Sequence, residues 1–462
     1  MPISSARKIA YEISRRLDSG REFAVDLLQR PAVSALKEAD RRLATELVMG
    51  VLRWRGELDF QIARVSGKKA EALDPEILTI LRMGAYQICH LERIPKRAVV
   101  DDAVELTKAA RKRSAAGFVN AVLRKFAPPE QRLPGSSFDQ LTPASRASVQ
   151  RTVPEWLLKR WAGRSIPGAE PGETPALRMA YACLAPPPTT IRPVLGRENL
   201  SDLKSELQSE GVVTSACEYA EHGLSVESGH LQDTRVYREG RVVIQDEASQ
   251  LVAELVRPEP GQRLLDLCAA PGMKAGQLAQ ALGAGALVAC DHSAARLHTL
   301  AKLLPPCIPA GVHLSMVRLD AAAGLPFGAK FERILLDAPC SGTGTLERNP
   351  EIKWRLRPQD ITRLAGLQAN MLRNSLPSLA PGGQLVYATC SLEPEENEDI
   401  VEKVLAQARG FEMLSASELA PRHPRLASLF DARGYFRTRP GQHRMDGFNA
   451  AVIVRRDGAA HL

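Results

Sequence analysis

Two cysteines stand in polar segments that directly follow apolar runs. "ILLDAPCSGTGT" contains Cys340, three residues after Asp337, and "VYATCSLEPEENED" contains Cys390. Taken alone, Cys340 could be a nucleophile, a metal ligand, half of a disulfide or a small buried residue. The eight cysteines are scattered singly, without a CxxC pair or the Cys/His spacing of zinc sites. We therefore expect free thiols in a reducing cytoplasm, and neither a disulfide nor a metal.

Two thiols and an acid suit methyl transfer to C5 of cytosine. C5 is too weak a nucleophile to attack a sulfonium methyl group. A thiolate that adds to C6, while a carboxylic acid protonates N3, gives an enamine whose C5 can attack. A base then removes the C5 proton and the thiol leaves. A free thiol with a pKa of about 8.5 is mostly protonated at neutral pH, so a nearby cation such as Lys274 would help. The residues alone do not say which cysteine attacks C6.

A third motif predicts a site for a nucleotide-like ligand. "LLDLCAAPGMKAGQLA" has an apolar run, a loop of small residues and a helix, so a ligand can approach the backbone and the helix N–H groups. The loop lacks the GxxxxGK[ST] pattern of a phosphate loop. Asp291, 19 residues after Gly272, stands where dinucleotide folds place the acid that binds ribose hydroxyls. Asp320 ends another apolar run. The alternative for both acids is a solvated strand end, and it is stronger for Asp320.

These motifs lie in a region of alternating strand-like and helical runs, which starts at about residue 245. Each polar motif follows one strand-like run, and these runs are "RLLDLCA", "ALVACD", "HLSMVRLD", "RILLDAP" and "GQLVYATC". Such alternation predicts an α/β domain with a mostly parallel sheet and helices on both faces. Ligands of these sheets bind at the carboxyl ends of the strands.

The preceding sequence predicts two further domains. Up to about residue 127 apolar residues recur at helical spacing, which predicts an all-α domain of six or seven helices. The segment 127–148 is rich in Pro, Ser and Gly and is typical of a linker. Residues 149–240 mix helical runs with short strands such as "TTIRPV", in which Arg192 is a candidate phosphate contact. The expected domains are 1–140, all-α; 141–240, a small α+β module; and 241–462, α/β.

The charge of the chain favours a polyanionic partner. The net charge is +8, and residues 1–130 hold 24 Lys and Arg against 17 Asp and Glu, including "RKR" at 111–113. A nucleic acid would suit this distribution, although solubility and a solvated helix end are simpler explanations. The sequence begins without a continuous apolar segment and has no run of 18 apolar residues. We therefore expect neither secretion nor membrane insertion.

Four segments resemble the RNA 5-methylcytosine methyltransferases of the NOL1/NOP2/Sun superfamily, and most of all its bacterial Sun/Fmu branch, the small-subunit ribosomal RNA methyltransferases B. They are "VVIQDEASQLVAELVRPEPGQRLLDLCAAPGMK", "ILLDAPCSGTGTLERNPEIKW", "YATCSLEPEENE" and "DGFNAAVIV". "DRRLATELVMGVLRWRGELDF", "ILRMGAYQICHLERIPKRAVVDDAVELTK" and "GFVNAVLRKF" are similar to the NusB-like helical domain that precedes the catalytic part in this branch.

The resemblance implies a Rossmann-like class I methyltransferase domain that uses S-adenosylmethionine (SAM) to methylate cytosine C5 in RNA, most of all 16S ribosomal RNA. It implies Cys390 as the nucleophile at C6, Cys340 as the thiol that assists product release, and Asp337 between the cofactor and the cytosine N3 edge. Lys274 remains the candidate catalytic cation. The target base must be flipped out of its stack. The cofactor-binding residues would be Cys268, Ala269, Ala270, Pro271, Gly272, Met273 and Lys274 around the methionine end, Asp291 at the ribose, Asp320 at the adenine, and Arg296 and Asp337 beside them. We expect a cytoplasmic monomer with RNA as its partner.

The chain departs from the family pattern at three catalytic-domain positions. The family usually reads "CAAPGGKT", and here Met273 and Ala275 replace the second glycine and the threonine. Because a positive φ at Met273 would cost about 1 kcal/mol or more, we expect an ordinary helical φ there. Asn449 stands where "DGFF" is common, near the family's cytosine pocket. Where the family has an Arg-x-Asn turn, this chain has Arg192 followed by Pro193 and Val194, so the Asn is missing.

Two alternatives remain open. One is the same chemistry on transfer RNA, or on DNA with Cys340 as the nucleophile. The other is a NusB-like RNA-binding assembly or antitermination factor whose methyltransferase half is inactive.

Overall fold

The computed structural model describes residues 3–18, 20, 22–129, 133, 138–163, 175–194 and 199–456. These residues form two compact units, and each is described by itself. The first unit comprises Met1–Pro186 together with Leu346–Leu356, and the second comprises Pro187–Thr345 together with Arg357–Leu462. No helix in the described ranges is long and apolar enough to cross a membrane.

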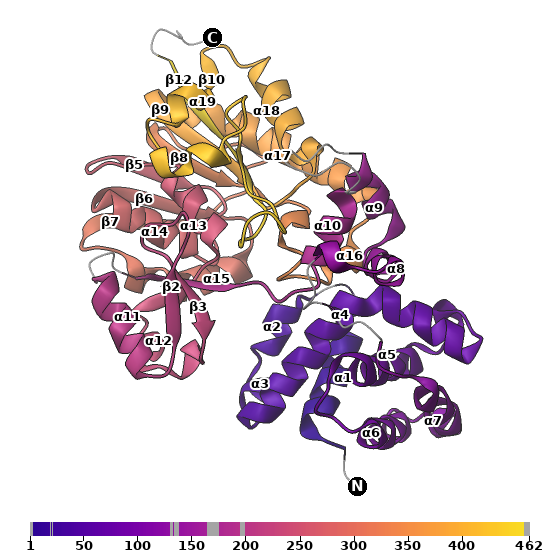
Figure 1. Cartoon of the computed structure of the whole chain (residues 1–462). Coiled ribbons are helices and arrows are strands. Elements are labelled where there is room, and N and C mark those ends of the chain that lie inside the picture. Colours follow the sequence, from indigo (N-terminus) through magenta and orange to yellow (C-terminus); the bar gives the residue numbers. More distant parts are fainter. Residues whose placement is uncertain are drawn as a thin grey trace. The chain divides into compact units, whose positions relative to one another are not determined.

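The first unit begins with seven α-helices, as the helical spacing predicts (Figure 1). Helix α5 is at its core, because 12 of its 16 residues are buried. Gly50 on α4 lets the two helices approach closely, since a Cβ there would lie 2.0 Å from the Tyr86 ring on α5. The helices are α1 Ser5–Leu17, α2 Ala24–Leu28, α3 Pro31–Ser34, α4 Glu38–Ser66, α5 Pro75–His90, α6 Lys96–Ala109 and α7 Ala116–Lys125.

Part of the segment that was predicted as a linker is helical. Helix α8, Pro143–Arg151, starts where Thr142 accepts a hydrogen bond from the Ser145 N–H, and Pro143 takes the first helical position. The abundance of Pro, Ser and Gly in this segment favours a linker and so obscures the helix start at Thr142 and Pro143. Residues 130–132 and 134–137 of the predicted linker lie outside the described residues. Helices α9, Glu155–Ala162, and α10, Pro175–Ala182, complete this part of the unit.

The segment Leu346–Leu356, with helix α16 Ile352–Arg355, belongs to the first unit although the chain on both sides of it belongs to the second. The Lys353 ammonium donates to the Arg53 carbonyl at 3.0 Å, and the Trp354 Nε1–H donates to the Leu52 carbonyl at 2.7 Å. Lys353 is 1% exposed. This short segment is therefore built into the helical unit by buried contacts.

The second unit contains a small antiparallel sheet in the order β2-β3-β1-β4. Its strands are β1 Thr189–Pro193, β2 Val213–Ala216, β3 Leu224–Ser228 and β4 Val242–Ile244, and helices α11 Leu200–Ser209 and α12 Arg235–Arg238 accompany them. Leu203 and Leu207 of α11 pack into one core with Ile191 and Leu224. The predicted strand "TTIRPV" is thus confirmed. The expected domain borders at residues 140 and 240 stay predictions.

The larger sheet has eight strands in the order β10-β12-β9-β8-β5-β6-β7, with β11 paired to β12. Strands β9, β8, β5, β6 and β7 are parallel, as predicted, whereas β10, β11 and β12 pair antiparallel. The strands are β5 Arg263–Asp266, β6 Ala284–Asp291, β7 Gly311–Arg318, β8 Phe331–Asp337, β9 Leu379–Thr389, β10 Phe411–Met413, β11 Phe436–Arg437 and β12 Asn449–Arg455.

Helices cover both faces of this sheet (Figure 1). Successive strand residues point to opposite faces, and the core divides accordingly. Leu264 of β5 packs with Leu278 and Leu300, whereas Leu265 packs with Leu372. The helices are α13 Glu247–Glu254, α14 Met273–Leu282 and α15 Ala294–Leu303, with α17 Pro358–Ser375, α18 Glu398–Leu405 and α19 Ala416–Leu419 later in the chain. Chain order reverses at β5, which lies between β8 and β6, so a ligand crevice is expected at its carboxyl end.

Candidate functional site

Acidic residues end three neighbouring strands of the large sheet. Asp266 is the last residue of β5, Asp291 of β6 and Asp337 of β8. Asp320 follows the edge strand β7, is exposed, and accepts a hydrogen bond from the Ala322 N–H at 3.0 Å. The carboxyl ends of the strands therefore gather the predicted acids Asp291, Asp320 and Asp337, together with Asp266, at one edge of the sheet.

The loop of small residues joins this edge to helix α14. Gly272 has a φ of +118°, a conformation that favours glycine, and α14 begins at the next residue, Met273. Met273 is not among the residues with positive φ. The expected helical conformation at Met273 is thus confirmed, and the departure from the family's second glycine causes no backbone strain.

Lys274, on the first turn of α14, reaches back to the end of β8. Its Nζ lies 2.8 Å from the Asp337 carboxylate and 5.1 Å from the centre of the Phe448 ring. Burial lowers the pKa of Lys274, but the charges of Asp337, Cys390 and Asp266 outweigh it, so that the pKa is raised overall. Lys274 is therefore a buried cation within electrostatic reach of the predicted nucleophile.

Asp266 was missed by the sequence analysis. It is 1% exposed, and its Oδ2 is buried without a hydrogen-bond partner among the described residues. Burial, followed by the charge of Asp337, raises the pKa of Asp266 to about 7. The available signal was its place in "DLCAAPG", as the last strand residue before the small-residue loop. The open oxygen and the shifted pKa identify Asp266 as a candidate ligand-binding group.

Arg296 connects Asp291 to the small-residue loop. Its Nε lies 3.2 Å from the Asp291 carboxylate, and its guanidinium donates to the Ala270 carbonyl. Asp291 also accepts a hydrogen bond from the Ser293 N–H at 3.0 Å. Arg296 itself is half-exposed. The structure thus brings these predicted cofactor-binding residues together at the end of β6.

The two cysteines meet at the ends of the adjacent strands β8 and β9. The Cys340 and Cys390 sulfur atoms lie 3.3 Å apart, within hydrogen-bonding distance, and both cysteines are free. Its hydrogen bond to Cys390, together with burial, raises the pKa of Cys340 well above the ordinary value. Cys340 therefore stays a thiol and can donate its proton to the Cys390 sulfur.

Asn449 contacts the loop of Cys390. It pairs with Thr389 across β12 and β9, and its side-chain amide donates to the Ser391 carbonyl at 2.5 Å. Arg437 in turn donates to the Asn449 Oδ1 at 3.0 Å. This departure from the family pattern thus replaces an apolar side chain with a hydrogen-bonded one directly beside the cysteine loop.

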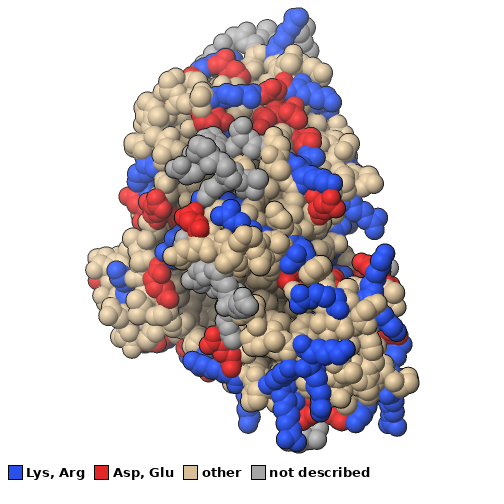
Figure 2. Space-filling view, turned by 45° about the vertical axis from the view of Figure 1, so that its right-hand side comes forward, with Lys and Arg blue, Asp and Glu red and all other residues tan. Residues whose placement is uncertain are grey.

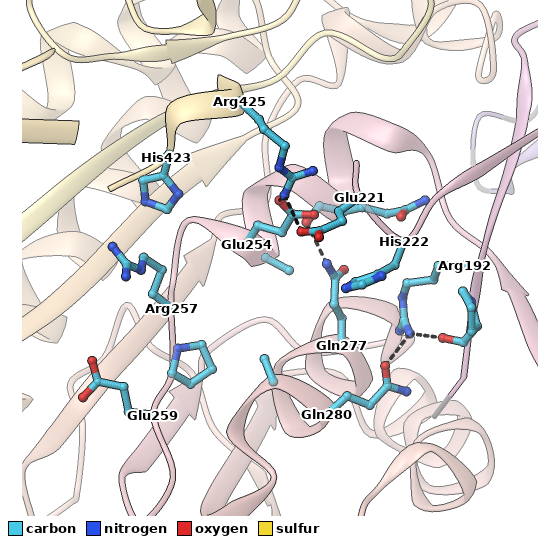
Figure 3. A pocket seen from close by; sticks show the side chains of 15 residues that line it. Arg192, Glu221, His222, Glu254, Arg257, Glu259, Gln277, Gln280, His423 and Arg425 are labelled. Carbon is cyan, nitrogen blue, oxygen red and sulfur yellow. Dashed lines mark hydrogen bonds and ion pairs between the residues drawn. The ribbon is translucent and has the colours of Figure 1, made fainter. Parts of the chain in front are cut away.

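Arg192, the candidate phosphate contact, is a buried internal clamp. It is 3% exposed and donates to the Gln280 side chain at 3.0 Å (Figure 3). It also donates to the Gln245 side chain at 2.6 Å and to the Met273 carbonyl at 2.7 Å. It therefore ties β1 of the small sheet to the first turn of α14, next to the small-residue loop.

A separate pocket with a volume of about 510 Å³ lies beside this clamp (Figure 3). Arg425 pairs there with Glu221 and Glu254, and burial raises the pKa of Glu254 to about 7. None of the predicted catalytic or cofactor-binding residues lines it. Its lining includes Arg192, Glu221, His222, Glu254, Arg257, Gln277, Gln280, His423 and Arg425.

Basic residues gather on the helical unit. Figure 2 shows Lys and Arg side chains over the lower right of that view, at the height where Figure 1 draws the first seven helices. In the "RKR" cluster Lys112 pairs with Asp74 at 2.5 Å, whereas Arg111 and Arg113 are exposed. No group of His, Cys, Asp and Glu in the described part of the chain could hold a metal ion.

Comparisons with known proteins match both units. The NusB family model matches residues 4–128, and the model "16S rRNA methyltransferase RsmB/F" matches residues 253–454. The probable ribosomal RNA small subunit methyltransferase B of Bacillus subtilis (strain 168) is 31% identical over 97% of this chain and 98% of its own. The ribosomal RNA small subunit methyltransferase B of Pseudomonas putida is 33% identical over 98% of each chain. The solved structure of PH0851 shares the fold, with a TM-score of 0.78, 23% identity, and coverage of 98% of this chain and 99% of that one.

Proposed function

Because the chain belongs to the 16S rRNA methyltransferase RsmB/F family, we propose that it methylates C5 of a cytosine in small-subunit ribosomal RNA, with SAM as the methyl donor. The observation that carries this proposal is the contact of the two thiols at 3.3 Å, beside the Lys274–Asp337 pair. Attack at C6 requires one thiol with a cation and a carboxylate, and a second thiol beside it can assist release of the product.

The residues at the strand ends fit SAM. The cofactor carries a positive sulfonium and an ammonium group, and the buried Asp266 offers a carboxylate oxygen that has no partner among the described residues. Asp291 would hold the ribose, Asp320 the adenine, and the loop from Cys268 to Gly272 the methionine end. When bound, SAM supplies the methyl group that C5 receives.

In the proposed mechanism Cys390 forms the covalent bond to C6 of the flipped-out cytosine. As the S–C6 bond forms, Asp337 carries the proton of the Cys390 thiol to N3, which makes C5 nucleophilic. Lys274, whose pKa is raised, stays protonated beside Asp337 and stabilises its carboxylate form. After methyl transfer a base takes the C5 proton, N3 gives up its proton and the S–C6 bond breaks. The Cys340 S–H donates to the departing Cys390 thiolate and so lowers the barrier to release.

The substrate is tested by bisulfite sequencing of ribosomal and transfer RNA from a deletion strain. We expect the loss of one or more 5-methylcytosines from small-subunit ribosomal RNA, and their return when the gene is restored. Loss from transfer RNA alone would reassign the substrate. An unchanged pattern in both RNAs, together with no SAM binding at millimolar cofactor, would favour a non-catalytic RNA-binding factor.

A further inference from the structure

In both cysteine loops the residue that follows the cysteine is a serine. Ser341 follows Cys340 and Ser391 follows Cys390. The two serine hydroxyls lie 3.0 Å apart, and the Gly344 N–H donates to the Cys390 carbonyl at 2.9 Å. Hydrogen bonds next to the two cysteines therefore join the loops to each other.

One buried carboxylate contacts both of these serines. Glu396 ends a short 3₁₀ turn, Pro394–Glu396, and is 0% exposed. Its Oε1 accepts a hydrogen bond from the Ser341 N–H at 2.8 Å, and its Oε2 accepts one from the Ser391 hydroxyl at 2.5 Å. A single side chain thus bridges the residues that follow the two cysteines.

Glu396 is itself fixed from the protein interior. The Gln368 side-chain amide on α17 donates to Glu396 Oε1 at 3.0 Å and to the Pro339 carbonyl at 2.8 Å, and the Tyr387 hydroxyl donates to the Glu396 carbonyl at 2.6 Å. A carboxylate loses its hydration on burial, and hydrogen bonds from both loops offset that loss only while the loops stay together. The carboxylate therefore favours the arrangement in which the thiols touch.

We propose that Glu396 is the positioning residue of the two-thiol site, and that through Ser341 and Ser391 it holds Cys340 against Cys390 for product release. This inference rests on the proposed function above. The charge of Glu396 also contributes to the raised pKa of Cys340, after the hydrogen bond to Cys390 and burial. Both effects keep Cys340 in the protonated form that can donate to a departing thiolate.

The test compares three substitutions in the full chain with 16S ribosomal RNA and SAM. In Glu396→Ala, Cys390 still forms the adduct but release fails, so kcat falls about 10²-fold and the covalent adduct accumulates on denaturing gels. Glu396→Gln keeps an oxygen for the Ser341 N–H and offers an amide donor to Ser391, so it restores release. Glu396→Asp is one methylene too short to span both loops and behaves like Glu396→Ala. Asp399→Asn, exposed on α18, is the matched control and leaves the adduct level unchanged.

Thermal melting and SAM titration accompany each variant, because a merely structural role would lower stability and cofactor affinity rather than trap the adduct. The inference is overturned if Glu396→Ala releases product at the normal rate, or if it folds and binds SAM but forms no adduct. Should Glu396→Ala not fold, equal release by Glu396→Gln and Glu396→Asp would also overturn it. If Cys340→Ala, run in parallel, traps no adduct, the proposed function fails instead.

Discussion

The sulfur atoms of Cys340 and Cys390 lie 3.3 Å apart although 50 residues separate them in the chain. Each follows one of two neighbouring parallel strands, β8 and β9, which bring their carboxyl ends to the same edge. In a hydrogen bond between two free thiols one sulfur donates the proton and the other accepts it, so the two thiols are not equivalent.

Substitution of the two cysteines should therefore have opposite consequences. Cys390→Ala removes the nucleophile, and we expect methyl transfer to fall to background with no covalent adduct. Cys340→Ala leaves the nucleophile but removes the proton donor, and we expect a protein–RNA adduct that survives denaturing gels. The measurement is transfer of labelled methyl groups together with gel mobility. If the adduct persists in Cys390→Ala and is missing in Cys340→Ala, the two roles are exchanged.

SAM affinity should rise with pH through neutrality. The pKa of Asp266 is raised to about 7, so the carboxyl is neutral below that pH and charged above it. A cationic cofactor binds the charged form better, and the dissociation constant should fall between pH 6 and pH 8 when followed by calorimetry. Asp266→Asn should weaken binding about tenfold and abolish this pH dependence. An unchanged slope in Asp266→Asn would assign the titration to another group.

Arg192→Lys should weaken SAM binding without unfolding the chain. Lysine keeps the charge but not the fork of donors that joins Gln245, Gln280 and the Met273 carbonyl. The first turn of α14 then loses its support, and we expect about a tenfold higher dissociation constant. The control is Arg257→Lys, an exposed lining residue of the same pocket whose side chain donates to Arg422. Equal affinities in the two variants would contradict the role of Arg192 as a clamp.

Lys353 should add to the stability of the helical unit as the pH rises from 8 to 10.5. Burial lowers the pKa of Lys353 from 10.5 to about 8. Between these values Lys353 holds a proton in the unfolded chain but not in the folded unit, so its own contribution to stability increases with pH by up to about 3 kcal/mol. Burial raises the pKa of Cys183 to about 12, which acts in the opposite direction, so the contribution of Lys353 is measured as the difference between the unmodified chain and Lys353→Met. Lys353→Met should remove this contribution of Lys353 to the pH dependence of stability. Lys69→Met, a substitution on the surface, should leave the pH dependence unchanged.

Tryptophan fluorescence during urea unfolding measures this effect selectively. All four tryptophans, Trp54, Trp156, Trp161 and Trp354, lie in the first unit. A rise in stability of the same size in Lys353→Met and in the unmodified chain would contradict the assignment to Lys353.

The strands and the acids at their ends could be predicted because the information is local. Each short apolar run ends at a polar motif, and parallel strands place such ends together. The sequence does not single out Asp266, because it directly continues an apolar run, although its carboxyl lies at the end of β5 among the other acids. Glu396 was missed because its partners, Ser341 and Gln368, are 55 and 28 residues away and no sequence period links them.

Helix α8 and the antiparallel strands show the same limit at the level of the fold. Pro143 lies in a segment whose composition is typical of a linker, whereas after Thr142 it starts a helix. Strands β10 and β11 are three and two residues long, too short for a period of two to be visible, and β12 pairs them to the sheet edge.

The segment Leu346–Leu356 makes the two units inseparable by a single cut. The chain passes between them three times, and the second and third passages bracket these residues. A protein that starts at residue 187 would still carry this segment, but without the Leu52 and Arg53 carbonyls that receive Trp354 and Lys353. Its freed aromatic and ammonium groups would face water. The helical unit thus completes the fold of a segment that the chain inserts between two parts of the second unit.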